Sequence, residues 1–138
     1  MALKNFPHKA NLNQFAHPDN PYKNGLGDLD LLAHNDKEFS AVAKKHPESG
    51  KVIKDWSDRE YSKKIISAIL RRDFQLNLQN PPGSLAPALT NKMNYLLYIR
   101  DLAKLNDQPI ENLYGIDIGT GAAMYFAAIG GFILRMWD

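Results

Sequence analysis

The sequence predicts an α/β protein, in which a mostly helical N-terminal part precedes the β-α-β start of a doubly wound sheet. Apolar residues recur at helical spacing in three segments between residues 28 and 105. A short apolar, β-branched run at 113–118 then leads directly into Gly119-Thr120-Gly121. The apolar stretch behind these glycines predicts a helix over 122–129 and a second strand over 132–137.

Composition and charge exclude several classes of protein. The 138 residues are 44% hydrophobic and 23% charged, which is typical of one globular domain or of one domain with a small annex. Seventeen Lys and Arg against 15 Asp and Glu give a net charge of only +2, so a nucleic-acid-binding patch would have to come from local arrangement. The chain has no cysteine, which excludes disulfides, cysteine-ligated zinc, iron–sulfur clusters and a cysteine nucleophile. We expect no metal site.

Residues 1–27 are polar and rich in Asn, Pro and Gly, and are predicted to form a flexible N-terminal arm. They lack the apolar run of a secretory signal. The apolar segment 122–134 has 13 residues, fewer than the roughly 17–25 that span a bilayer. A soluble, intracellular protein without membrane attachment is therefore expected.

Residues 28–89 are predicted to form a helical module. Its first helix starts near Asp28, and a weak alternation at 51–56 indicates a short strand. Ser57 and Glu60 have the spacing of a capping box and predict the start of a second helix that runs to Phe74. The basic residues of this helix are expected to lie on a solvated surface rather than on a phosphate; they are Lys63, Lys64, Arg71 and Arg72.

Residues 90–138 are predicted to begin a second unit. A helix over 91–105 comes first, and we expect the three helices to pack together and against the strand at 113–118. The residues expected on the buried side of this helix are Met93, Leu96, Leu97, Leu102 and Leu105.

The glycine turn after the first strand carries the chemistry. Glycines at 119 and 121 lack a Cβ and can take positive φ, so their backbone amides can face a nucleotide-like cofactor. Position 124 is Met, so the third glycine of the dinucleotide-binding fingerprint is missing. Asp117-Ile-Gly119-Thr-Gly121 is instead similar to the first motif of methyltransferases that use S-adenosylmethionine. The other possibility is a structural glycine turn.

Six blocks between His17 and Gly121 resemble, in register, the methyltransferase-like protein 16 family of RNA adenine-N6 methyltransferases, whose bacterial relatives modify ribosomal RNA. In order, these blocks are H-P-D-N-P-Y at 17–22, D-L-D-L-L-A at 28–33 with Phe39, G-K-V at 50–52 with Trp56 and Asp58, L-R-R-D-F at 70–74, K-M-N-Y at 92–95 with Asp101-Leu102, and G-I-D-I-G-T-G-A at 115–122.

The resemblance implies a Rossmann-like domain, S-adenosylmethionine as cofactor and structured RNA (small nuclear RNA, messenger RNA hairpins or ribosomal RNA) as partner. It places Gly119, Thr120 and Gly121 in the cofactor turn, with Ala123 at a cofactor-contacting position. Lys92 stands where the family has an arginine that reaches the cofactor's carboxylate; the other interpretation is a solvated cation at a helix start. The resemblance implies that residues 28–89 bind RNA, and the candidate RNA-binding residues are His17, Lys23 and Lys51. It also implies a location in the nucleus or the cytoplasm.

The chain departs from the family at its C-terminus. The family holds the target amine with an N-P-P-F motif after a later strand, and this sequence contains no such motif. Asn80-Pro81-Pro82-Gly83 precedes the cofactor motif and lacks the aromatic residue, so it is interpreted as a loop that ends a helix. No catalytic residue is therefore assigned, and the methyltransferase domain is expected to be incomplete. The alternative function is a non-catalytic RNA-binding fragment.

Overall fold

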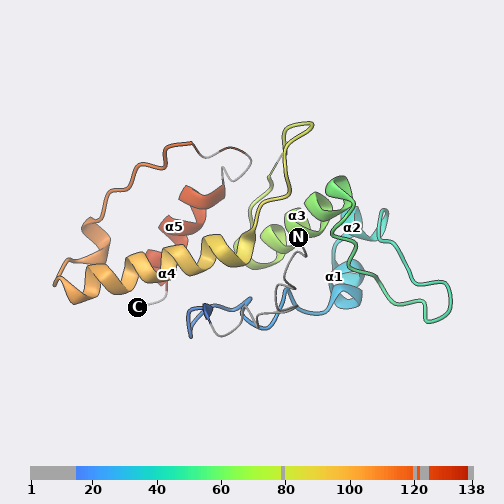
Figure 1. Cartoon of the computed structure of the whole chain (residues 1–138), viewed down its shortest axis with the longest axis horizontal. Helices are drawn as coiled ribbons and strands as arrows, with labels where there is room; N and C mark the ends of the chain where they lie inside the picture. The colour runs from blue at the N-terminus through green and yellow to red at the C-terminus, as the bar shows by residue number, and fades with distance from the viewer. Residues whose placement is uncertain (1–14, 79, 120, 122–124, 137–138) are drawn as a thin grey trace, which may run out of the picture.

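The computed structural model describes residues 15–78, 80–119, 121 and 125–136. In chain order its helices are α1 (Leu29–Asn35), α2 (Lys37–Ser40), α3 (Arg59–Phe74), α4 (Leu89–Leu105), the short 3-10 helix η2 (Ile110–Asn112) and α5 (Tyr125–Met136). Helices α1 to α3 form one end of the molecule, and α4 extends from them toward the other end with α5 beside it (Figure 1). No helix within the described ranges is long and apolar enough to cross a membrane.

Aspartates set the starts of the first three helices. The Asp28 carboxylate accepts hydrogen bonds from the amides at the start of α1, and Asp36 caps α2 by accepting from the Phe39 amide. Asp58 caps α3, because its carboxylate accepts from the Tyr61 amide at 2.9 Å. The capping box predicted for Ser57 and Glu60 is therefore wrong. An aspartate one residue further along satisfies the free helix amide instead.

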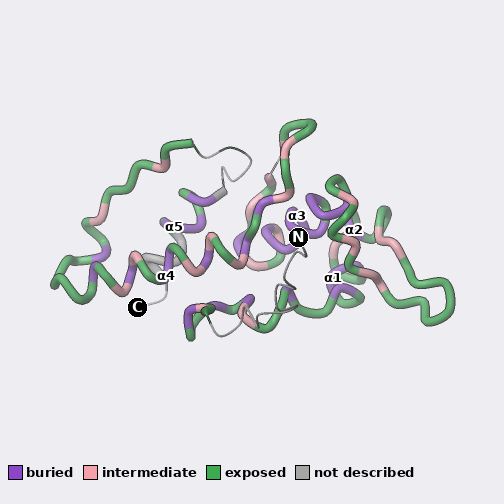
Figure 2. Tube along the Cα trace, in the orientation of Figure 1, coloured by how far each residue is buried: buried purple, intermediate pink, exposed green. Residues whose placement is uncertain are grey.

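The core lies where α3 meets α1, α2 and the first half of α4 (Figure 2). Ile65, Ile69 and Leu70 of α3 are completely buried, as is Leu97 of α4. One cluster contains residues of all three predicted helices, so their packing against one another is confirmed. The burial of Leu102 and Leu105 was predicted wrongly, since they are 58% and 80% exposed; the last turn of α4 buries Ala103 instead.

Neither predicted strand of the second unit is present in the described residues. Segment 113–118 forms no ladder, and Tyr114, Ile116 and Ile118 are at least 90% exposed. The predicted strand 132–137 is helical as far as Met136, and position 137 lies outside the described residues. A strand must pair its backbone groups with a neighbour, whereas a helix satisfies them internally. The predicted α/β class is therefore not seen, and the described part of the chain is helical.

The predicted strand at 51–56 is reduced to one antiparallel bridge between Lys45 and Val52. This bridge closes a loop that leaves α2 and returns to the start of α3 (Figure 1). The helix predicted over 122–129 is observed from Tyr125 onward, and residues 122–124 lie outside the described residues.

The described part of the N-terminal arm, residues 15–27, lies along α4. Asn20 is 1% exposed, and its amide group donates to the Thr90 carbonyl at 3.0 Å and to Asn94 Oδ1 at 2.6 Å. His17 is 3% exposed; its Nδ1 accepts from the Asp19 amide, so its Nε2 donates to the Asp101 carboxylate at 2.7 Å. The arm is therefore positioned by buried polar contacts, which its composition did not indicate.

We expect Asn20→Ala to destabilise the protein by about 1–3 kcal/mol, because it removes the two hydrogen bonds that the buried amide group of Asn20 donates to α4. Urea unfolding would measure this loss, and limited proteolysis should cleave the arm earlier than in the unaltered protein. Asn24 is exposed in the same segment, so Asn24→Ala is the matched control. Equal unfolding midpoints for the two variants would show that the arm is not held by Asn20.

Candidate functional site

The glycine turn lies between the extended segment 113–118 and α5. Gly119 and Gly121 have φ values of +75° and +53°, which is the left-handed region that a side chain disfavours. A Cβ built on Gly119 would meet nothing within 4 Å, and one on Gly121 would meet only the Gly119 carbonyl oxygen at 4.0 Å. The turn thus exposes bare backbone, as the sequence predicted. Thr120 and Ala123 lie outside the described residues.

Asp117, two residues before the turn, has a carboxylate oxygen that is buried and accepts no hydrogen bond from any described residue. An oxygen of this kind is costly unless a donor reaches it. A ligand with an ammonium group, such as the methionine part of S-adenosylmethionine, supplies such a donor. The positive-φ glycines and this oxygen therefore fit the predicted cofactor.

Lys92 lies on the second turn of α4, with its side chain partly buried. Its Nζ is 4.9 Å from the ring centroid of Phe126 on α5, within the range of a cation–π interaction. The Tyr95 ring packs against the same Phe126 ring at 5.7 Å between centroids. The structure thus brings Lys92 to the first turns of the helix that follows the glycine turn. The contact with Phe126 is compatible with either predicted role of Lys92, namely contact with the cofactor's carboxylate or a solvated cation at the start of a helix.

The three predicted RNA-binding residues lie in different environments. Lys51 is exposed on the loop between α2 and α3, and no carboxylate of the described residues pairs with it. The ammonium group of Lys23 donates to the Pro18 carbonyl within the arm. His17 is buried, and the edge of its ring lies against Tyr98 at 4.9 Å between centroids. Of these three residues, Lys51 is the one whose ammonium group is exposed to solvent without a described partner.

Several other cations are neutralised within the protein. Arg71 makes a two-pronged contact with Asp36 at 2.8 and 2.9 Å, and its guanidinium lowers the pKa of that carboxyl. Lys63 is 3% exposed and pairs with Glu60 at 2.8 Å, so the predicted solvated surface is wrong at this position. Arg100 pairs with Asp19 at 2.6 Å, so this ion pair helps to hold the arm to α4.

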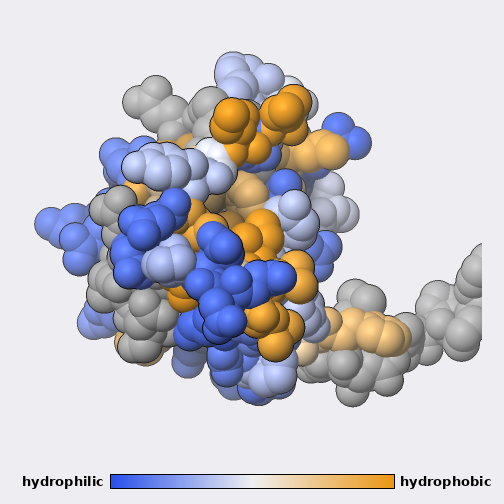
Figure 3. Space-filling model, turned by 90° about the vertical axis from the view of Figure 1, so that its left-hand side faces the viewer, coloured by the Kyte–Doolittle hydropathy of each residue, from blue (hydrophilic) through white to orange (hydrophobic). Residues whose placement is uncertain are grey.

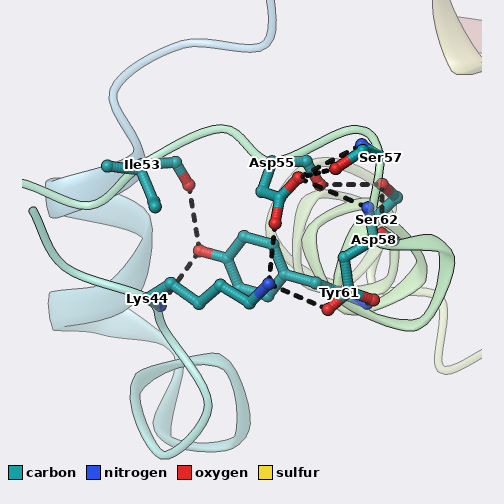
Figure 4. Close-up of polar contacts among 7 residues, drawn as sticks. All are labelled: Lys44, Ile53, Asp55, Ser57, Asp58, Tyr61 and Ser62. Carbon is teal, nitrogen blue, oxygen red and sulfur yellow. Dashed lines mark hydrogen bonds and ion pairs between the residues drawn. The ribbon is translucent and has the colours of Figure 1, made fainter.

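A polar network fixes the loop that enters α3 (Figure 4). Lys44 Nζ lies between Asp55 and Asp58, at 2.7 and 2.8 Å from their carboxylates. The Tyr61 hydroxyl donates to the Ile53 carbonyl at 3.1 Å and accepts from the Lys44 amide at 3.2 Å. The hydrogen bonds that Lys44 donates to the carboxylates of Asp55 and Asp58 raise the pKa of Lys44 to about 12, and the hydrogen bonds that Asp55 accepts from Lys44 and Ser57 lower the pKa of Asp55 to about 2. Sequence spacing gave no signal for this network, because Lys44 and Asp58 are 14 residues apart and are brought together only by the fold of the loop.

This network predicts a contribution to stability that is lost in acid. Because the pKa of Asp55 is lower in the folded protein, its contribution is complete above the ordinary value of 3.8 and disappears as the pH falls toward about 2. We expect Asp55→Asn to flatten the pH dependence of the thermal midpoint within this window. Glu48 is exposed on the same loop, and Glu48→Gln is the control. If the thermal midpoint of Asp55→Asn depended on pH as steeply as that of the wild type, this would contradict the assignment of the lowered pKa to Asp55.

A turn of positive-φ glycines with open surroundings, followed by a helix, is typical of a domain that binds a nucleotide-like cofactor. A family model described as RNA methyltransferase matches residues 10–137, and the chain belongs to this family. The resemblance found in the sequence is thereby confirmed.

Two curated relatives illustrate the match. The U6 small nuclear RNA (adenine-(43)-N(6))-methyltransferase of Caenorhabditis elegans is 38% identical over 118 residues, which are 86% of this chain and 24% of the relative. The RNA N(6)-adenosine-methyltransferase METTL16 of Homo sapiens is 31% identical over 123 residues, which are 86% of this chain and 21% of the relative. The chain thus spans about a quarter of the length of these proteins.

Two solved structures show that the fold agrees as well. The N-terminal domain of human METTL16 in complex with SAH has a TM-score of 0.71 at 30% identity, covering 84% of this chain and 45% of that one. The human catalytic domain in complex with a MAT2A 3'UTR hairpin has a TM-score of 0.69 at 29% identity, covering 84% of this chain and 40% of that one. The described helices therefore have the arrangement of part of a methyltransferase domain.

Proposed function

We propose that this chain supplies the cofactor turn and an RNA-binding helical module to an S-adenosylmethionine-dependent RNA adenine-N6 methyltransferase that acts on structured RNA. The observation that carries the proposal is the glycine turn, with its positive φ angles and open surroundings, in a chain of the RNA methyltransferase family. Relatives named as U6 small nuclear RNA and RNA N6-adenosine methyltransferases support the reaction and the partner. They also support a location in the nucleus, with the cytoplasm as the alternative.

In this proposal the residues of the chain bind the cofactor and orient it toward the target adenine. The bare backbone of Gly119 and Gly121 lies against the cofactor, with Thr120 and Ala123 as further contacts. The Asp117 oxygen that lacks a donor accepts from the cofactor's ammonium group, and Lys92 turns from Phe126 toward its carboxylate. When bound, S-adenosylmethionine supplies an electrophilic methyl group for adenine N6. Holding the two reactants in line accounts for much of the acceleration in such a transfer.

The RNA-binding part comprises residues 28–89, with the described part of the arm, residues 15–27, beside it. Lys51 and Lys23 contact RNA phosphates, while His17 acts as a positioning residue that holds the arm on α4. The complex of a METTL16 catalytic domain with an RNA hairpin supports this assignment, because its arrangement extends over 84% of this chain. Two phosphate contacts give a modest but measurable salt dependence.

Two titrations of the chain test the proposal. Isothermal titration with S-adenosylhomocysteine should show saturable binding, and filter binding to an RNA hairpin should weaken as the salt concentration rises. Lys51→Gln should lower the magnitude of the log–log salt slope by about one, whereas Lys37→Gln on α2 should leave it unchanged. RNA binding without S-adenosylhomocysteine binding would favour the non-catalytic RNA-binding fragment instead. Binding of neither ligand would refute the proposed function.

A further inference from the structure

We infer that a cavity between the loop entering α3 and the start of α4 binds an unpaired nucleotide of an RNA strand, with its base stacked on Trp56 and its phosphate near Lys54. The inference rests on the proposed function, because it requires that the chain binds RNA. It adds a second kind of contact to the phosphate contacts of Lys51 and Lys23.

The cavity has a volume of about 510 Å³. It is lined by the arm at Leu26, by Trp56, by Ile66 of α3 and by the segment that leads into α4 at Leu89. Lys54 is the one charged residue of the lining, which contains no carboxylate. Its ammonium group pairs with no carboxylate of the described chain. A largely apolar cavity with one lysine at its side suits a ligand that joins a flat, uncharged ring to a negatively charged group.

Trp56 is 50% exposed, although indole is among the largest apolar side chains. The backbone on both sides of it is fixed by the network around Asp55 (Figure 4). Asp55 Oδ1 accepts from the Ser57 amide at 3.2 Å and from the Asp58 amide at 3.3 Å, while Lys44 holds the other carboxylate oxygen at 2.7 Å. The indole is thus held at the cavity by a loop whose conformation is set in advance. A ligand that stacks on it does not have to order this loop.

An RNA base fits these features better than an aliphatic group does. Every base has an aromatic face that can stack on indole, and every nucleotide carries a phosphate that a lysine attracts. A base inside a duplex has its faces covered by its neighbours, so the cavity selects a nucleotide from a loop, bulge or single strand. Loss of one such stacking contact lowers affinity by roughly 5- to 100-fold.

Tryptophan fluorescence provides a direct test. The chain contains two tryptophans, at 56 and 137, so Trp137→Phe leaves Trp56 as the single tryptophan, whose emission is excited selectively at wavelengths that tyrosine does not absorb. We expect single-stranded oligoadenylate to quench this fluorescence, and a fully paired RNA duplex of equal length to quench it little. Equal quenching by the duplex would overturn the assignment of an unpaired base. Saturable quenching by AMP alone at the oligoadenylate midpoint would show a site for a free nucleotide and would overturn the RNA strand as occupant.

Variants separate this inference from the proposed function. Trp56→Leu should weaken oligoadenylate binding by roughly 5- to 100-fold, and Trp56→Phe by much less, because phenylalanine still stacks. Tyr114→Leu is the matched control, since Tyr114 is fully exposed and lies outside the cavity. Thermal unfolding must match the wild type in each variant, because Trp56 lies outside the core. Unchanged affinity in Trp56→Leu, together with hairpin and S-adenosylhomocysteine binding by the wild type, would overturn the inference and leave the proposed function intact.

Discussion

We expect Gly121→Val to abolish detectable binding of S-adenosylhomocysteine while leaving the helix content of the protein unchanged. At a φ of +53° a β-branched side chain is strained by the order of 1–3 kcal/mol, so the turn must change its backbone conformation. The added side chain also occupies space at the surface where the proposed cofactor approaches. The turn lies outside the hydrophobic core, so the helices keep their packing.

Isothermal titration and far-ultraviolet circular dichroism together measure this effect. Gly115→Val is the matched control, because Gly115 lies in the extended segment before the turn, does not have positive φ, and has open space around it. It should bind as the wild type does. Wild-type affinity in Gly121→Val would show that the cofactor does not lie against this backbone.

Ile69→Asp should unfold the protein under conditions in which the wild type is folded. Ile69 is completely buried in α3, at the centre of the cluster that joins α1, α2, α3 and α4. An unpaired carboxylate at such a site costs more than about 4 kcal/mol, a large part of the roughly 5–15 kcal/mol that stabilises an ordinary domain. The expected result is loss of the cooperative thermal transition.

Two further substitutions test the cause of that loss. Lys64→Asp changes an exposed position of the same helix and should shift the thermal midpoint only slightly. Ile69→Val removes one methylene and should cost about 0.5–1.5 kcal/mol. A cooperative transition in Ile69→Asp at the wild-type temperature would show that α3 is not packed as described.

The helices were predictable because their apolar residues repeat with the period of the helix. Met93, Leu96 and Leu97 lie on the buried side of α4 as this spacing requires. Leu102 and Leu105 are exposed because, at about 100° per residue, they fall on the side of α4 opposite this face, whereas Ala103 in the same turn is buried. An apolar side chain is therefore not enough to place a residue in the core, because its position around the helix decides whether it lies on the buried face.

The strands could not be predicted from a local pattern, because pairing depends on what lies beside them. Segment 113–118 has a β-branched composition, yet it forms no ladder with another described segment. On the surface of the molecule at the C-terminal end of α4, exposed apolar side chains lie between hydrophilic ones (Figure 3). In the candidate site, the positive φ of Gly119 and Gly121 agreed with the motif, whereas the burial of His17 depends on α4 and gave no sequence signal.

The attachment of the arm to α4 has a consequence for the order of events during synthesis. Asn20 and His17 bind partners that lie 74 and 84 residues later in the chain, at Asn94 and Asp101. At about 5–20 residues per second, a ribosome adds these partners roughly 4–17 s after the arm. Throughout this interval Asn20 and His17 are accessible to chaperones and nascent-chain proteases. The arm therefore reaches these native contacts only after most of α4 has been made.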